Sequence, residues 1–556
     1  MINKNLKDYL LNMREEDGFF KSGLSDSPIS TAIVCVALKI ADQEKYATQI
    51  KAAEAWLEAN CNADGLYGDS IESPPNLTAT YLAAMALPSA KRAKAYLETQ
   101  FGSFSFEDVK HGLLAEYGKD LTFSVPLLAL ATASGFFEDT AAAWRGMPRF
   151  PFEAAVLPEG LFKYMNLPVV SYAIPALICV GLAQLKFMKD GILKRLRSLA
   201  VKKALHVLEA KQPEDGGFLE AAPLTGFCAI CLCAADMKDH PVAQKALQFL
   251  IDTQRENGAW PIARDLRQWV TTLALTILAP EFSTEEKAFY RQALAQSQTK
   301  SIHPFTRSMP GGWAWTTYSG GVPDADDTPS ALIALHALGE GVTPTVINGI
   351  KWLLDLQNRD GGIPTFCRGW GKLPFDRSCP DLTAHTFRAI SLYMNDLPEP
   401  LQSRAQKAQR SLLHFLETTQ NPDGSFTPLW FGDQLAADKT APVYGSAVVL
   451  EHLVCVDKPF LRKTLDYLLK MQHATGGWGS TDGKTDYVIV TARCISALKP
   501  YPEAAEAVSR GLEFLRPFAA SPQTAPMEPI GLYFAHLWYS EKLYAPIFLA
   551  KAVTDD

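Results

Sequence analysis

Apolar segments of helical length alternate with short turns along most of the 556-residue chain, and no stretch shows the strict apolar–polar alternation of a half-buried β-strand. The turns share the pattern Gln-x-x-x-Gly-x-aromatic, which is complete at Gly216, Gly258, Gly424 and Gly476. The step from Gly216 to Gly258 is 42 residues and that from Gly424 to Gly476 is 52, a period that fits one helix pair per repeat. The pattern therefore predicts an all-α fold of repeated helix pairs.

Each part of the turn pattern has a structural interpretation. Glycine suits the left-handed residue that ends a helix. The aromatic ring can cover the exposed helix end, and the Gln amide can bond backbone groups that the helix leaves free. The turns alone therefore predict architecture and not activity.

A second pattern follows the turns, because a threonine opens an apolar helical run at six places. These are Thr31, Thr78, Thr271, Thr328, Thr383 and Thr491. We interpret these runs as the inner helices of α/α toroids, so that their first turns converge on one rim of a central cavity. Thr328 is expected to cap its helix, with Pro329 in the first turn.

Three carboxylates crowd into four positions directly before the Thr328 helix: Asp324, Asp326 and Asp327. Crowded like charges keep at least one proton on such a group, while the positive end of the helix dipole favours a strong acid. Aligning Thr328 with Thr383 places Asp326 opposite Asp381 and His385 opposite Ser330. The cluster can also be a plain helix cap with a solvent-facing or Ca²⁺-binding turn, and a single His in an apolar helix is often a core residue.

Composition narrows the function classes. The net charge of −7 and a pI near 5.9 argue against a nucleic-acid partner. Ten cysteines in a chain of this length do not form a disulfide framework, and we expect buried thiols in a reducing cytosol. The first eight residues lack the apolar core of a signal peptide.

The region 160–200 raises the question of membrane contact. Residues 164–185 carry no charge, but Pro168 and Pro175 interrupt them, which favours a buried or cavity-lining segment over a membrane span. Residues 186–203 alternate basic and apolar positions. This stretch can lie on an anionic bilayer surface or form an ordinary outer helix.

The chain resembles the squalene–hopene cyclase family of bacterial class II triterpene cyclases over nearly its whole length. The resemblance rests on several motifs in the family's order. They are Pro148 to Tyr164 with Leu157-Pro158, Gly311-Gly312-Trp313-Ala314-Trp315, Asp324-Ala325-Asp326-Asp327-Thr328, Asp381-Leu382-Thr383-Ala384-His385, Val443-Tyr444-Gly445-Ser446-Ala447 and Gln472-x-x-x-Gly476-Gly477-Trp478-Gly479.

The resemblance implies two α/α barrels, one inserted into the other near the N-terminus. We expect an acid-bearing catalytic barrel from residues 1–15 and 265–556, and an inserted barrel from 16–264 with a membrane-contact segment near 160–200. It also implies a monotopic or peripheral enzyme on the cytoplasmic side of the membrane. Its substrate would be an apolar polyprenoid, squalene first, and it would need no metal or other cofactor. We also keep a homodimer as an option.

The resemblance also implies roles for single residues. Asp326 would protonate a terminal alkene, His385 would orient its proton, and Asp324 and Asp327 would tune and reload the acid. The carbocation would then need aromatic walls that attract it without reacting with it. Family positions for such walls are occupied by Trp269, Trp315, Phe366 and Trp478, although Trp478 also fits a purely structural place in its turn.

Two departures from the family pattern concern the product. Val270 stands where the family usually has Asp, and His536 falls roughly where a cavity Tyr is expected. His536 could take a proton from a carbocation or hydrogen-bond a polar substrate. The chain is also shorter than typical members.

Several alternatives stay open at this point. Oxidosqualene cyclases carry a single acid before a Cys. Diterpene class II cyclases bind a diphosphate with Mg²⁺, and the candidate Glu138-Asp139 lacks a third carboxylate at Ala142. A zinc site as in prenyltransferase β-subunits has only Cys379 and His385 to offer. Substrates of diterpenoid or meroterpenoid type, or a non-catalytic isoprenoid-binding toroid, are the remaining readings.

Overall fold

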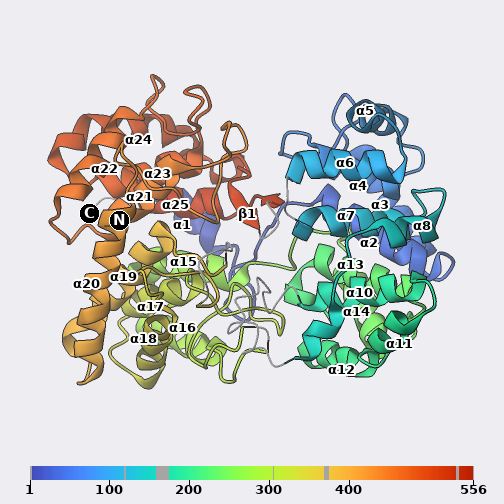
Figure 1. Ribbon diagram of the computed structural model, residues 1–556. Helices are drawn as coiled ribbons and strands as arrows, with labels where there is room; N and C mark the ends of the chain where they lie inside the picture. Colours follow the sequence, from blue (N-terminus) through green and yellow to red (C-terminus); the bar gives the residue numbers. More distant parts are fainter. Residues whose placement is uncertain are drawn as a thin grey trace. The chain divides into compact units, whose positions relative to one another are not determined.

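The computed structural model describes residues 3–117, 121–157, 174–304, 306–368, 375–533 and 537–554 (Figure 1). Helices dominate these ranges, where the sheet structure is one antiparallel pair, β1 (Gly531–Tyr533) and β2 (Leu537–Tyr539). The predicted all-α toroid fold is confirmed. The chain forms two compact units, one from Met1–Leu24, Asp265–Thr317 and Gly321–Asp556, the other from Ser25–Arg264 and Tyr318–Gly320.

Six inner helices of the first unit form a closed ring, in which each helix packs on the next and the last packs on the first. They are α15 (Arg267–Leu278), α17 (Asp327–Ala337), α19 (Pro380–Tyr393), α21 (Pro442–His452), α23 (Val488–Leu498) and α25 (Tyr544–Val553). Outside them lie α1 (Lys4–Leu11), α16 (Thr284–Ser297), α18 (Pro344–Leu356), α20 (Leu401–Thr419), α22 (Pro459–Lys470) and α24 (Ala505–Ala520). Short 3-10 turns are η4 (Ala279–Glu281), η5 (Met394–Asp396), η6 (Pro502–Ala504) and η7 (Pro522–Thr524).

In the second unit, α13 (Ala222–Ala234) packs on α2 (Pro28–Asp42), α10 (Ile174–Phe187) and α7 (Leu121–Ala133), while α2 also packs on α4 (Leu77–Ala86). Further helices are α3 (Ala47–Ala59), α5 (Lys91–Phe101), α6 (Phe106–Tyr117), α8 (Thr140–Gly146), α11 (Ile192–Ser198), α12 (Val201–Lys211) and α14 (Pro241–Asp252). The 3-10 turns are η1 (Phe152–Val156) and η3 (Phe218–Glu220).

One hydrogen bond recurs between a glycine turn and an inner helix. The Trp313 backbone N–H donates to the Thr328 hydroxyl at 3.0 Å, and the Trp478 N–H donates to Thr491 at 2.8 Å. The expectation that Thr328 is the N-cap is therefore wrong, because α17 begins one residue earlier, at Asp327, and the hydroxyl serves the neighbouring turn. In α17 and α23 the threonine thus fixes where the helix meets its turn. The predicted Thr78 does not do so, because the Tyr67 N–H donates to Thr80 instead.

The same bond closes each unit between segments far apart in sequence. In the first unit the Phe20 N–H donates to Thr271 at 2.8 Å. In the second unit the Trp260 N–H donates to Thr31 at 3.0 Å. The turn at Phe20 thus bonds α15, and the turn at Trp260 bonds α2. The first of these bonds joins residues near position 20 to the part of the same unit that begins at Asp265.

The Gln residues act as the turn pattern predicts. The Gln420 Nε2 donates to the Gly424 carbonyl at 3.0 Å and to the Phe460 carbonyl, at the start of α22, at 2.8 Å. Gln298 makes the equivalent pair of bonds to Gly311 and Thr345, which shows that the Gly311 turn is a full repeat with a longer loop.

The region predicted to contact the membrane includes α10, α11 and the residues between them. In the described part of the chain, no helix is both long and apolar enough to cross a bilayer. Residues 158–173, part of the uncharged segment, lie outside the described residues. α10 is largely buried, whereas four apolar side chains of the next segment are exposed: Ile192, Leu193, Leu196 and Leu199.

Candidate active site

The acidic loop before α17 is shaped by Asp324. Its Oδ1 accepts the backbone N–H groups of Asp326 (2.8 Å) and Asp327 (2.7 Å), so this carboxyl caps the N-terminus of α17. The Ala325 N–H donates to the Thr365 carbonyl at 2.9 Å, which ties the loop to the turn of the next repeat. These bonds direct the Asp326 side chain into the ring of inner helices.

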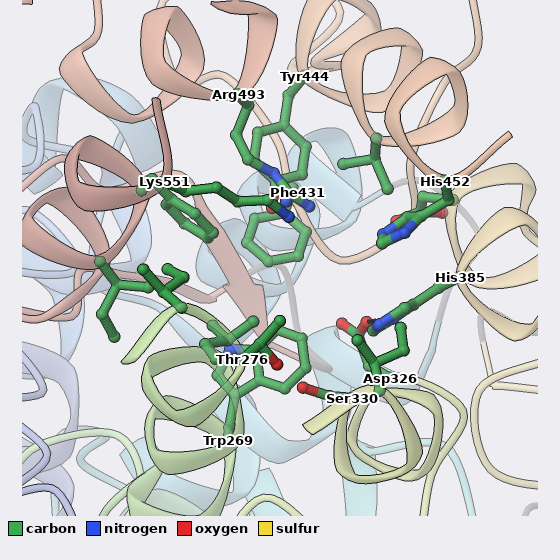
Figure 2. Close-up of a pocket in the computed structure, with 17 residues that line it drawn as sticks. Trp269, Thr276, Asp326, Ser330, His385, Phe431, Tyr444, His452, Arg493 and Lys551 are labelled. Atoms are coloured by element: carbon green, nitrogen blue, oxygen red, sulfur yellow. Dashed lines mark hydrogen bonds and ion pairs between the residues drawn. The ribbon is translucent and has the colours of Figure 1, made fainter. Parts of the chain in front are cut away.

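Asp326 meets His385 at the start of α19, as the repeat alignment of the two helices predicts. His385 Nδ1 lies 3.1 Å from Asp326 Oδ1, and both line a cavity of about 50 Å³ inside the first unit (Figure 2). Asp381 and Ser330 line the same cavity. The side chain of His385 is 7% exposed and that of Asp326 is 25% exposed, so the pair sits at a sheltered but open place.

The carboxyls around Asp326 are buried, and burial favours their protonated forms. Burial raises the pKa of Asp324 to about 7. Burial, together with the charge of Asp324, raises the pKa of Asp327 well above its usual range. Burial also raises the pKa of Asp381 to about 6, and its Oδ1 accepts the Cys379 thiol. Near neutral pH this cluster therefore holds protons.

Of the predicted aromatic walls, Trp269 reaches this cavity. Its Nε1–H donates to the Tyr544 hydroxyl at 3.1 Å, and its ring meets His385 edge-on with centroids 6.3 Å apart. Trp315 and Phe366 pack edge-to-face at 6.2 Å in a separate aromatic cluster that does not line the cavity.

Three further predicted site residues do not line the cavity. Trp478 is fully buried, and its Nε1–H donates to the Leu468 carbonyl at 2.7 Å, so it covers its turn. Asp324 and Asp327 stand behind Asp326 in the acid loop and are not among the lining residues. His536 lies outside the described residues.

Polar residues of α21, α23 and α25 also line the cavity and were missed from the sequence. They are Tyr444, His452, Arg493 and Lys551. Arg493 follows Thr491-Ala492 as His385 follows Thr383-Ala384, so the register that predicted His385 also indicates Arg493. Lys551 and His452 lie further along their helices and carry no comparable signal.

The arrangement suits proton transfer to a weak base. A carboxyl hydrogen-bonded to an imidazole faces a cavity with mostly apolar walls, among them Leu273, Ile333 and Val448. Aromatic faces lie close by, and such faces attract cations without offering a lone pair for reaction. These are the components that acid-initiated carbocation chemistry requires.

The chain matches two family models. Residues 302–491 match the squalene-hopene cyclase C-terminal domain, and residues 2–108 match the prenyltransferase alpha-alpha toroid domain. Among curated relatives, a probable squalene–hopene cyclase of Sinorhizobium fredii is 24% identical over 325 residues, which is 53% of this chain and 48% of the relative. The squalene–hopene cyclase of Bradyrhizobium diazoefficiens is 29% identical over 239 residues, 37% of this chain and 34% of the relative.

A terpene cyclase–glycosyl transferase fusion protein of Humicola fuscoatra is 26% identical over 348 residues, 54% of this chain and 25% of the relative. The matched part thus spans less than half the length of each of these relatives. Among solved structures, ent-copalyl diphosphate synthase from Streptomyces platensis shares the fold, with a TM-score of 0.53 at 17% identity over 96% of this chain and 95% of that one. Both family models and the cyclase relatives support assignment of the chain to the squalene–hopene cyclase family of class II terpene cyclases.

Proposed function

We propose that this protein cyclises a long polyene isoprenoid, squalene as the first expected substrate, by protonating its terminal double bond with Asp326. The observation that carries the proposal is the 3.1 Å contact between Asp326 and His385 at a sheltered cavity inside the ring of inner helices. The similarity to the squalene–hopene cyclase family supports the same reaction type.

In the proposed step, the Asp326 carboxyl gives its proton to a terminal alkene carbon, and the π electrons form the new C–H bond. The carboxylate left behind accepts a hydrogen bond from the His385 Nδ1–H, which stabilises it. The cation then closes rings along the polyene and ends by losing a proton or by taking up water. Asp324 orients the loop by capping α17, and the buried, protonated Asp327 adjoins it as a source for reloading.

Aromatic rings stabilise the travelling cation in this proposal, each by roughly 0.5–2 kcal/mol. Trp269 has the strongest support, since it contacts His385 and lines the cavity. Trp315 and Phe366 form one edge-to-face pair and are proposed to line the path of the polyene beyond the acid.

The substrate partitions into lipid, so we also propose peripheral membrane binding through the segment that carries Ile192, Leu193, Leu196 and Leu199. Leu199 is 81% exposed and Ile192 is 78% exposed, which is unusual for apolar side chains in a solvated surface. Basic residues of the same segment would add attraction to anionic headgroups on the cytoplasmic side.

The test is incubation of the purified protein in detergent or liposomes with squalene, geranylgeranyl diphosphate or a prenylated aromatic acid, followed by mass spectrometry of the lipids. Formation of a cyclic product from squalene in the presence of EDTA supports the proposal. A cyclic product from one of the other two substrates assigns the substrate class instead. No cyclic product from any substrate would favour an isoprenoid-binding role. Turnover that EDTA abolishes and Mg²⁺ restores would contradict the metal-free mechanism.

A further inference from the structure

Three charged residues form a cluster on the wall of the acid cavity, each from a different inner helix. Glu451 of α21 binds Arg493 of α23, with Oε2 and Nη1 2.9 Å apart, and its Oε1 pairs with the Lys551 ammonium of α25. The Glu451 and Arg493 side chains are 7% and 9% exposed. We call these residues the charge triad; it carries two positive charges and one negative.

The triad is not explained by stability. Buried ion pairs contribute little or nothing compared with apolar side chains of similar size, because both charges lose their hydration. The Arg493 Nε also lacks a hydrogen-bond partner among the residues that the structure describes. A net positive charge has thus been placed in a barrel whose other walls are largely apolar.

The triad is close to the acid. Arg493 and Lys551 line the same cavity of about 50 Å³ as Asp326 and His385, and Figure 2 shows all four side chains directed into it. The charges of Arg493 and Lys551 lower the pKa of Glu451 although burial alone would raise it, so Glu451 is ionised. The net charge of the triad is therefore +1 at neutral pH.

His452 lines the same cavity and contacts the acid pair. Its ring stacks on His385 with centroids 4.6 Å apart and an interplanar angle of 18°. Burial, followed by the charges of His385, Arg493 and Lys551, holds the pKa of His452 well below 6.5. A neutral ring thus stacks on the acid pair and is itself within reach of the triad's positive charges.

We propose that the charge triad sets the proton-donating strength of the Asp326–His385 pair through its net positive charge. A fixed cation nearby favours the deprotonated form of the pair and makes Asp326 the strong acid that an alkene requires. Arg493, Glu451 and Lys551 are positioning residues in this scheme, since they act through Asp326. The inference rests on the function proposed above.

Other ionisable groups face the pair from the surrounding elements. The carboxyls are Asp324 and Asp327 beside α17 and Asp381 on α19; burial keeps Asp327 protonated at neutral pH and raises the pKa of Asp324 to about 7 and that of Asp381 to about 6. Arg388 of α19 adds a more distant positive charge that acts on His452. Phenols face it from Tyr444, Tyr539 and Tyr544, and burial raises the pKa of each. Asp324 and Asp381 therefore change charge between pH 6 and 8, and they do so alike in every triad variant compared below.

The test compares the pH dependence of kcat/KM in matched variants. Activity falls on the alkaline side when the pair loses its proton, and the midpoint of that fall is the measured quantity. Lys551→Met removes one positive charge and should raise the midpoint by about 0.5–1 pH unit. Lys551→Arg keeps the charge and should leave the midpoint within about 0.2 unit of wild type. Lys470→Met, on the exposed surface of α22, controls for removal of a distant charge.

Glu451→Gln makes the opposite change and should lower the midpoint by a similar amount. A structural role alone would lower activity in both variants without opposite shifts. If Glu451→Gln does not fold, the comparison of Lys551→Met with Lys551→Arg still tests the proposal. Equal midpoints for these two variants and the wild type would overturn it.

Titration of the His385 ring by NMR, with ¹³C-labelled histidine assigned through His385→Ala, gives a second readout that needs no turnover. The His385 midpoint should move in the same opposite directions in Lys551→Met and Glu451→Gln. An inactive wild type would refute the proposed cyclase function, and the histidine shifts would still show whether the triad controls the pair. Unmoved histidine midpoints would overturn the triad proposal in an active or an inactive protein.

Discussion

Replacing Asp326 with Asn is the most direct test of the proposed chemistry. The two side chains have nearly the same shape, so the cavity and the 3.1 Å approach to His385 should persist. What disappears is the transferable proton. General-acid catalysis contributes typically 10²–10⁴-fold. Because protonation initiates the whole reaction, we expect a loss of about 10³-fold or more, which corresponds to about 4 kcal/mol of barrier.

The structure allows few substitutes for the missing acid. The Asp324 carboxyl is held by two backbone N–H groups of α17 and points to the helix rather than to the cavity. Asp381 does line the cavity, and burial raises its pKa to about 6, but its Oδ1 is engaged by the Cys379 thiol. The double variant Asp326→Asn/Asp381→Asn therefore measures any residual donation by Asp381.

The assay is initial-rate formation of cyclic product, followed by mass spectrometry, with unchanged circular dichroism and thermal unfolding as evidence of folding. Asp466→Asn serves as the matched control, since it removes an exposed carboxyl of α22 that does not line the cavity. Folded Asp326→Asn protein with a rate within tenfold of wild type would show that another group donates the proton.

Four further changes test separate parts of the account. His385→Ala should reduce the rate severely but less than Asp326→Asn, because it orients the acid without supplying the proton; a smaller loss for Asp326→Asn would reverse the roles. Trp478→Ala should cost ~3–5 kcal/mol in urea unfolding, with product per folded molecule unchanged, because the ring is fully buried in its turn. Burial raises the pKa of Glu220 to about 9, so the folded protein keeps a proton that the unfolded chain releases above about pH 4.3. The free energy of unfolding should therefore fall as the pH rises from about 5 to 9. Glu220→Gln should make this fall smaller. Leu196→Glu with Leu199→Glu should weaken binding to anionic liposomes at least about tenfold, and unchanged sedimentation with liposomes would exclude this face.

The repeat architecture is readable from sequence because it depends on local chemistry. A left-handed glycine, a Gln amide and a covering aromatic ring each act within one turn, and the structure shows such bonds at Gln420 and Gln298. The same locality explains why aligning Thr328 with Thr383 placed Asp326 against His385. The prediction of the helix cap was wrong in detail. The Thr328 hydroxyl accepts the backbone N–H of Trp313, and Asp324 caps α17 instead.

Contacts across the ring could not be read from local patterns. Glu451, Arg493 and Lys551 look like isolated charges in apolar helices until three helices bring them together. The separation of Trp315 and Phe366 from the Trp269 cavity likewise depends on how far each loop reaches, which the repeat period does not encode.

One equivalent position in the inner helices of the first unit carries side chains of very different chemistry. Two residues after the threonine or serine that bonds each turn, the chain places Leu273, Ser330, His385, Val448 and Arg493, and all five line the acid cavity. The repeated hydrogen bond fixes where that position points, whatever residue occupies it. Chemistry can therefore change at this position without disturbing the turn that supports it. A chain in which one repeat carries the acid loop, the next an imidazole and a later one a guanidinium is then a single scaffold with different side chains at one register. The cavity charge follows from those choices, and for this reason the pH dependence of Lys551 and Glu451 variants is a stronger test of the mechanism than loss of activity alone.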